Sequence, residues 1–142
     1  MKLRATWAFA VLAFAGVLLG PSGNAFAQDQ ETLQKGQQLW VGSGCGNCHG
    51  ARGEGGTSHD FPLGPSLRTS QLDHETLVTV IQCGLPSTPM PAWLKGAYAE
   101  ASCYGSAPGD GPPEGLALIN LMTAEEIESL ATFIEARIMK RP

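Results

Sequence analysis

The chain has 142 residues, four cysteines and a formal net charge of −4 at pH 7. This length is enough for one small domain beside a targeting segment and too short for two domains. The acidic balance argues against nucleic acid as a partner, because the phosphate backbone is bound by an excess of Lys and Arg.

The first 27 residues are typical of a secretory signal. Residues 1–4 form a short basic region, an apolar run follows over residues 5–19, and Ala25 and Ala27 suit a cleavage site. The apolar run is shorter than the roughly 20 residues of a membrane-spanning helix. We therefore expect removal after Ala27, with a retained membrane anchor as the alternative.

The mature chain would then be a single domain of residues 28–142. Lys2 and Arg4 leave with the signal whereas every acidic residue stays, so the mature net charge is about −6. Export across the inner membrane predicts a periplasmic location, where disulfides persist. A core of this size is marginal by itself, and a large apolar cofactor would add to it.

A first helix is expected over residues 31–41, where Leu33, Gly36 and Trp40 recur at intervals of three and four. A glycine inside a helix costs roughly 1 kcal/mol relative to alanine. Gly36 therefore suggests a place where another helix comes close, although plain tolerance of the glycine is nearly as good an explanation.

The chain is organised around Cys45-Gly46-Asn47-Cys48-His49, which has the spacing of a c-type haem attachment motif. Positions i and i+3 share one face of a helix, so both sulfurs can form thioethers with one porphyrin. The imidazole of His49 can then bind the iron. A thioredoxin-like pair or half of a zinc site are the alternatives. The first requires a βαβ context and the second another ligand pair, and the sequence contains neither.

Glycine-rich residues 50–56 follow the motif and predict a loop that turns around the haem edge. A second helix is marked by Asp73 as its cap, by Leu72 and Leu77 as a hydrophobic staple, and by Gly84 past its end.

The last helix is the best defined in the sequence. Thr123 and Glu126 form a capping box, and Met122 with Ile127 forms a staple. Its apolar face is expected to contain Ile127, Leu130, Ala131, Ile134 and Ile138. Residues 91–121 lack a clear pattern and predict an extended loop, and no strand alternation persists long enough to argue for a sheet.

A haem iron held by one histidine needs a second ligand or stays open to small molecules. Met90 is the strongest candidate, because Pro89 and Pro91 stiffen the backbone that presents its thioether. Core filling is the alternative role for this methionine. Met122, His59 and His74 are the other candidate ligands. With both axial positions filled, the iron suits electron transfer and not substrate chemistry.

Cys83 and Cys103 lie outside the haem motif. In an exported protein a disulfide between them is the leading interpretation, with two free thiols or an intermolecular bridge as alternatives. The bond would close a loop that contains Met90, and such a loop stabilises by roughly 3 kcal/mol. It would also hold the methionine segment at both ends.

Over residues 31–137 the order of these parts resembles the class I cytochromes c. The resemblance implies that His49 is the proximal ligand, that its ring donates to the Pro65 carbonyl, that Leu67 packs on the haem face and that Met90 binds the far side. It also implies an all-α cytochrome c-like fold, with three main helices around one covalently bound haem and long loops. In that fold an aromatic residue, here Phe133, meets the glycine of the first helix.

The function that these parts imply is that of a periplasmic single-electron carrier and not an enzyme. It would pass electrons from a dehydrogenase or membrane complex to a downstream acceptor. A haem subunit held permanently on a periplasmic dehydrogenase of the quinoprotein or molybdenum type is the alternative, and a gas-binding haem sensor is a third hypothesis. The extra cysteines and the long segment after Met90 depart from the family pattern and indicate either a docking surface or an inert insertion.

Overall fold

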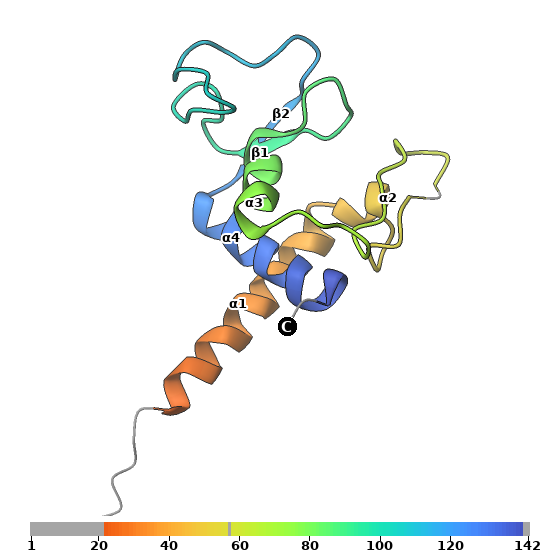
Figure 1. Cartoon of the computed structure of the whole chain (residues 1–142), viewed down its shortest axis with the longest axis vertical. Coiled ribbons are helices and arrows are strands. Elements are labelled where there is room, and N and C mark those ends of the chain that lie inside the picture. The colour runs from red at the N-terminus through yellow and green to blue at the C-terminus, as the bar shows by residue number, and fades with distance from the viewer. Residues whose placement is uncertain (1–21, 57, 141–142) are drawn as a thin grey trace, which may run out of the picture.

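The computed structural model describes residues 22–56 and 58–140 (Figure 1). The elements of this part are, in chain order, α1 (Ser22–Gly42), α2 (Cys45–His49), α3 (His74–Cys83), β1 (Ala92–Leu94), β2 (Leu118–Met122), α4 (Ala124–Phe133) and the π-helical η1 (Ile134–Met139). Most of the predicted secretory signal lies outside the described residues, and α1 begins nine residues before the predicted start of the first helix. Among the residues described, the structure contains no helix that is both long and apolar enough to span a membrane.

Helices α1 and α4 cross and pack against each other (Figure 1). Gly36 is buried at the crossing, where a Cβ atom would overlap the carbonyl oxygen of Ser129 and lie 2.5 Å from the Cβ of Phe133. Lys35 Nζ and Glu126 Oε1, 3.5 Å apart, join the same two helices at the surface. The expectation that Gly36 marks a close helix approach is confirmed.

Helix α3 begins and ends where the sequence predicts. The Asp73 carboxylate accepts a hydrogen bond of 2.8 Å from the Thr76 amide, and Gly84 ends the helix with a φ of 69°. Its buried residues Leu77, Val78 and Ile81 join the main core, and the helix packs against α4. The capping residue therefore determines where α3 begins, and the apolar face determines which side of the helix is buried.

Helix α4 contains the predicted capping box. The Thr123 hydroxyl accepts a bond of 3.2 Å from the Glu126 amide, and the Glu126 carboxylate accepts one of 3.0 Å from the Thr123 amide. The apolar face is buried as predicted, and consists of Ile127, Leu130, Ala131, Ile134 and Ile138. From Ile134 onward the backbone is π-helical, which the sequence pattern did not indicate.

The expectation of a chain without a sheet is wrong at one place. Strands β1 and β2 pair in parallel, with Ala92 opposite Leu118 and Leu94 opposite Met122. The longer strand holds extra residues between these pairs, and Asn120 takes a left-handed φ of 53° there. Strands of three and five residues are too short to show an alternating pattern, and a distant partner in sequence leaves no local signal.

Residues 95–117, which connect β1 to β2, form a lobe with a small core of its own. We call this segment the lobe; it lies at the top of Figure 1. Its core contains Ala97, Tyr98 and Leu116, packed with Cys83 and Cys103. The structure joins Cys83 to Cys103 by a disulfide. The segment predicted as an extended loop is thus a lobe fastened to the end of α3.

Candidate cofactor site

The Cys-x-x-Cys-His motif occupies the short helix α2. Gly44, with a left-handed φ of 71°, precedes the helix, and Cys45 and Cys48 then follow one turn apart. Both thiols are half-buried and are not bonded to each other. Burial, with a smaller contribution from Cys48, raises the pKa of Cys45 to about 11. A thiol that stays protonated at neutral pH does not suit a redox-active dithiol pair.

The glycine-rich loop wraps directly on α2. The amide of Gly64 donates to the Cys48 carbonyl at 2.8 Å, and the amide of Gly55 donates to the His49 carbonyl at 2.7 Å. These bonds satisfy carbonyl groups that a helix end leaves unpaired. A Cβ at Gly64 would lie 2.8 Å from His49 Nδ1, and one at Gly56 would overlap the Cys48 carbonyl. Only glycine allows the loop to come this close.

The ring of His49 is oriented by the backbone of Pro65. Its Nδ1 lies 3.0 Å from the Pro65 carbonyl oxygen. A carbonyl can only accept, so Nδ1 carries the proton and the lone pair remains on Nε2, the atom available to a metal. The Trp40 ring lies 6.5 Å from the imidazole, and its Nε1 donates to the Ala51 carbonyl at 3.2 Å. The end of α1 therefore supports the histidine.

The main core connects the motif helix with residues farther along the chain. Cys45, Leu67, Met90 and Trp93 are all partly buried and pack against the main core. The Trp93 indole nitrogen is buried without a hydrogen-bond acceptor among the described residues. An unpaired buried donor costs about 1–3 kcal/mol, so an acceptor supplied by a bound group fits beside this N–H.

Met90 is presented by a braced segment. Its amide donates to the Thr88 hydroxyl at 3.2 Å, and its carbonyl accepts from the Leu85 amide at 3.0 Å. These two bonds add to the stiffness that Pro89 and Pro91 give the backbone. The thioether is thus carried on a short turn between the end of α3 and β1.

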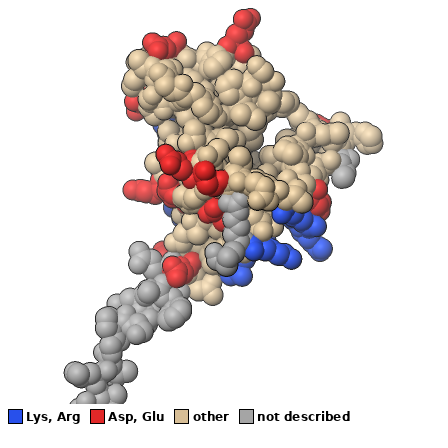
Figure 2. Space-filling model, in the orientation of Figure 1, with Lys and Arg blue, Asp and Glu red and all other residues tan. Residues whose placement is uncertain are grey.

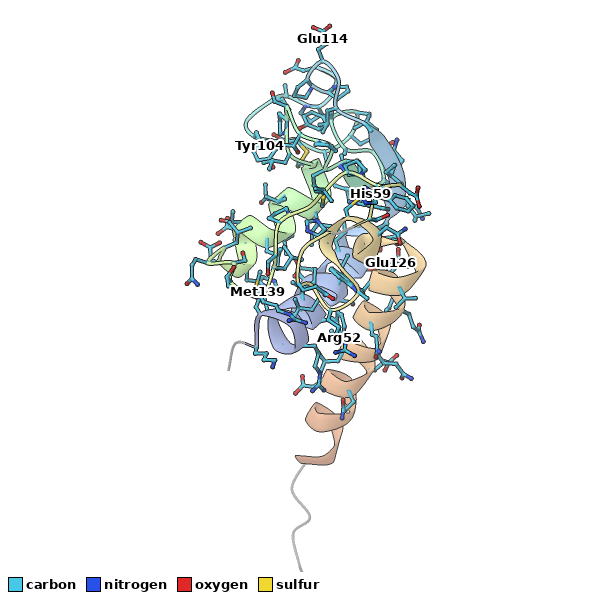
Figure 3. The ribbon with its side chains drawn as sticks, turned by 90° about the vertical axis from the view of Figure 1, so that its right-hand side faces the viewer. Arg52, His59, Tyr104, Glu114, Glu126 and Met139 are labelled. Carbon is cyan, nitrogen blue, oxygen red and sulfur yellow. A yellow bond between two sulfur atoms is a disulfide. The ribbon has the colours of Figure 1, made fainter. Side chains whose placement is uncertain are left out.

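The structure gives the other candidate ligands different surroundings. Met122 is fully buried, with 0% exposure, under the start of α4. His74 lies between two carboxylates, with Nδ1 2.7 Å from Glu135 Oε2 and Nε2 2.9 Å from Glu128 Oε2. His59 is exposed in the loop (Figure 3). Met139, which the sequence analysis did not weigh, is buried in the main core from η1.

Charged residues of the glycine loop form a small network at the surface. The Glu54 carboxylate accepts from the Arg52 amide at 2.7 Å and lies 3.9 Å from Arg68 Nη2. Hydrogen bonds from the backbone amides of Glu54 itself and Arg52 lower the pKa of Glu54. Arg68 Nε also donates to the Arg52 carbonyl at 3.1 Å. All three side chains are exposed, so they brace the loop from its outer side.

Two tyrosine contacts near the methionine segment were not foreseen from the sequence. Tyr98 Oη donates to the Cys83 carbonyl at 3.1 Å, and Tyr104 Oη donates to the Gly84 carbonyl at 2.6 Å. Both tyrosines of the chain lie close to Cys103 in sequence, and this spacing is a signal that could have indicated their role. They fasten the lobe to the end of α3 beside the disulfide.

A family model described as cytochrome c oxidase, cbb3-type, subunit III matches residues 31–104, which is more than half of the chain. The chain therefore belongs to this family, and it is a c-type cytochrome. Its cofactor is haem c, an iron porphyrin bound covalently to the polypeptide. A domain of this family implies a helical cytochrome c-like fold, which α1, α3 and α4 agree with.

One relative is cytochrome c55X of Pseudomonas aeruginosa, to which the chain is 44% identical over 52 residues. The match covers 34% of this chain and 39% of that protein, so it spans well under two thirds of the relative. No solved structure matches the chain.

The residues present fit covalently bound haem c. Cys45 and Cys48 provide two unbonded sulfurs on one turn, and the contact of His49 Nδ1 with Pro65 leaves Nε2 available to an iron. The unpaired Trp93 N–H provides a donor for an acid group of a porphyrin. The two sulfurs and the imidazole thus lie together on α2, and Cys45 and Trp93 pack against the same core.

Proposed function

We propose that this cytochrome is a periplasmic single-electron carrier with His/Met axial ligation. Cys45 and Cys48 would attach the haem, and His49 would bind its iron. The observation that carries this proposal is the 3.0 Å contact between His49 Nδ1 and the Pro65 carbonyl. It prepares Nε2 as a ligand on the same helical turn that carries both cysteines.

The Pro65 carbonyl has two effects on His49. It holds the imidazole ring in one orientation, and by accepting a hydrogen bond from Nδ1–H it makes Nε2 a stronger electron-pair donor to the iron. The loop that contains Gly64 leaves the imidazole ring little freedom, because Gly64 lies against the edge of the ring. When bound, haem c supplies an iron that changes between the ferrous and ferric states by one electron.

Met90 is proposed as the second axial ligand, with Leu67 packing on the haem face. The braced turn of Met90 would hold the thioether in place when the iron changes its oxidation state. This small reorganisation favours rapid electron exchange over substrate chemistry. The Cys83–Cys103 bond closes the segment that contains Met90, and it would restrain movement of this ligand. A closed coordination shell agrees with an electron carrier that is not an enzyme.

Location and partners follow from the predicted export. Cytochrome c domains are typically extracytoplasmic, and removal of the predicted signal would leave a strongly acidic protein. Such a protein is steered toward partners whose docking face is positively charged. The proposed donor is a dehydrogenase or a membrane complex, and the proposed acceptor is a downstream redox protein.

An absorption spectrum combined with a redox titration tests this proposal. The protein is expressed with a working haem-attachment system and compared with a variant in which Cys45 and Cys48 are both replaced by Ser. We expect a c-type spectrum, haem that stays attached to the polypeptide after denaturation, and a reversible one-electron couple. All three are expected to be lost in the variant. A colourless exported protein, or one whose haem is extracted by acidified solvent, would overturn the proposal.

A haem subunit held on a larger redox enzyme is the second candidate function. The lobe favours it, because a segment of this size with a core of its own suits a permanent interface. Purification in a fixed ratio with a dehydrogenase would establish this candidate, whereas isolation as a free monomer would support the diffusible carrier.

A further inference from the structure

A groove of about 430 Å³ lies between the lobe and the segment that leads to Met90. Leu85 and Pro86 form one wall, and the other is formed by lobe residues that include Tyr98, Tyr104, Pro112 and Pro113. The lining is mainly apolar and aromatic. Leu85 is 41% exposed and Tyr104 is 51% exposed, so both can contact another molecule.

The two sides of the groove are fixed to each other. The disulfide joins Cys103 of the lobe to Cys83 at the end of α3. Both tyrosine hydroxyls donate to carbonyls of the Cys83–Gly84 segment, at 3.1 and 2.6 Å. A groove held open in this way loses little conformational entropy when it is filled, which favours binding.

The lobe around the groove is acidic. The lobe contains Glu100, Asp110 and Glu114, and its one base is Lys95, which follows β1 directly and lies near Glu126. All three acids are exposed, and Glu114 lies at the tip of the lobe (Figure 3). Figure 2 shows acidic side chains projecting from this end, whereas Lys and Arg gather at the opposite, lower right side. The groove is therefore an apolar surface on an acidic lobe. We call Glu100, Asp110 and Glu114 the rim, because Asp110 and Glu114 flank the lining residues 111–113 in the sequence.

The groove is also connected to the proposed axial ligand. The Leu85 amide, in its wall, donates to the Met90 carbonyl at 3.0 Å. A molecule seated against Leu85 and Pro86 would lie beside the methionine segment. The link between the groove and the iron rests on the proposed function, in which Met90 is the axial ligand.

We propose that this groove docks a redox protein partner that inserts an apolar or aromatic side chain flanked by Lys and Arg. Charge complementarity carries this choice of occupant, since the lobe carries three acids against one base, Lys95, which lies at the base of the lobe near Glu126. Two copies that met lobe to lobe would repel each other, and an anionic membrane surface would be repelled in the same way. The lobe is thus a built docking surface and not an inert insertion.

Tris(phenanthroline)cobalt(III) is a suitable probe, because it presents flat aromatic faces and a positive charge. The complex is titrated into the ferric protein at low salt, where no electron transfer takes place because the iron is already oxidised. Changes in NMR chemical shift then report where the complex binds. We expect the largest shifts at Leu85, Tyr98 and Tyr104. Replacing Glu100 and Glu114 by Gln and Asp110 by Asn weakens binding about five-fold, and high salt removes the difference.

A matched control neutralises three exposed acids elsewhere, Asp29, Glu31 and Glu75. This control has the same net charge as the lobe variant, so it separates the local rim from overall charge. We expect it to bind the cobalt complex nearly as well as the parent. Equal weakening in both variants, or shifts centred outside the groove, would overturn the proposal.

Tyr104 provides a test of the apolar contact. Tyr104→Ser removes the ring from the groove, whereas Tyr104→Phe keeps it and loses only the hydroxyl. We expect the first variant to bind the probe several-fold more weakly and the second to stay close to the parent, because the disulfide and the Tyr98 contact still hold the groove. Two parent-like variants, or sedimentation showing that a second copy occupies the groove, would contradict the proposed occupant.

Kinetics with the same probe separate this inference from the carrier function. Ferrous protein gives one electron to cobalt(III), forming ferric protein and cobalt(II), and the lobe variant is expected to react more slowly than the control. If neither variant nor the parent has a reversible couple, the proposed function fails. If all share the couple and react equally, the docking site alone is wrong.

Discussion

Gly36 of α1 lies against the Cβ of Phe133 in α4, with no room for a side chain on the glycine. The crossing holds α1 and α4 together as a frame, and α1 leads directly into the motif helix α2. The support of His49 by Trp40 depends on this frame, because Trp40 lies one helical turn beyond Gly36 on α1.

Gly36→Ala is therefore expected to destabilise the protein although alanine is the better helix former. Overpacking of a buried site costs about 1–3 kcal/mol, which exceeds the roughly 1 kcal/mol that alanine contributes to a helix. Urea unfolding of the haem protein measures the difference. Gly42→Ala is the control, because a Cβ there would meet no described atom within 4 Å. Equal stability of the two variants would contradict the close crossing.

The helices could be predicted because their signals are local. Asp73 and Thr123 both cap the helices that they were expected to cap, and the apolar residues of the last helix are buried as a set. The sheet could not be predicted, since the whole lobe separates β1 from its partner β2 in the sequence. The change to π-helix at Ile134 also left no mark in the pattern.

The motif residues of the candidate site were predictable because Cys45, Cys48 and His49 have a fixed spacing within one turn. The contact of His49 with Pro65 followed only from a family resemblance, since it joins the end of α2 to a loop 16 residues farther along the chain. The contacts of Tyr98 and Tyr104 were missed. A hydroxyl that pairs with a distant carbonyl has no periodicity by which it could be recognised.

His74 is predicted to couple stability to pH. Hydrogen bonds from its ring to Glu135, and secondly to Glu128, raise its pKa above the usual 6.5. Because the native pKa is raised, the stabilisation is fully present below about pH 6.5 and is lost as the pH rises through the native pKa. The pH dependence of urea unfolding in the parent and in His74→Gln measures this contribution.

NMR titration of the His74 ring assigns the effect to its two partners. We expect Glu135→Gln to lower the pKa of His74 more than Glu128→Gln does, because the Glu135 contact is the stronger cause. In His74→Gln the stability lost between acidic and neutral pH becomes smaller than in the parent. If the His74 ring titrates at or below pH 6.5 in the parent, the proposed bridge from this ring to Glu135 and Glu128 is ruled out.

Trp93→Phe tests whether the buried indole N–H finds an acceptor in the haem protein. A hydrogen bond to a charged group contributes about 1.5–3 kcal/mol, so its loss lowers the free energy of unfolding by that order. The midpoint potential is expected to shift with it, because a carboxylate near the iron loses a donor. Unchanged stability and potential would mean that this N–H stays unpaired when the haem is attached.

Replacing both Cys83 and Cys103 by Ser is expected to lower the free energy of unfolding by roughly 3 kcal/mol. The looser segment would also let imidazole displace Met90 from the ferric iron, so its affinity for added imidazole rises. Tyr98→Phe is the control, since it removes one contact of the lobe and leaves the disulfide intact. Imidazole affinity equal to that of the parent would show that the bond has no role in holding the ligand.

Carbon monoxide binding to the reduced protein tests most directly whether His49 and Met90 close the coordination of the iron. The parent and a Met122→Leu control, altered in the core, are expected to bind carbon monoxide weakly and slowly. Met90→Ala, with its sixth position open, is expected to bind it rapidly and tightly. If the parent binds carbon monoxide as readily as Met90→Ala, Met90 is not the ligand, and the account of a closed electron-transfer centre is wrong.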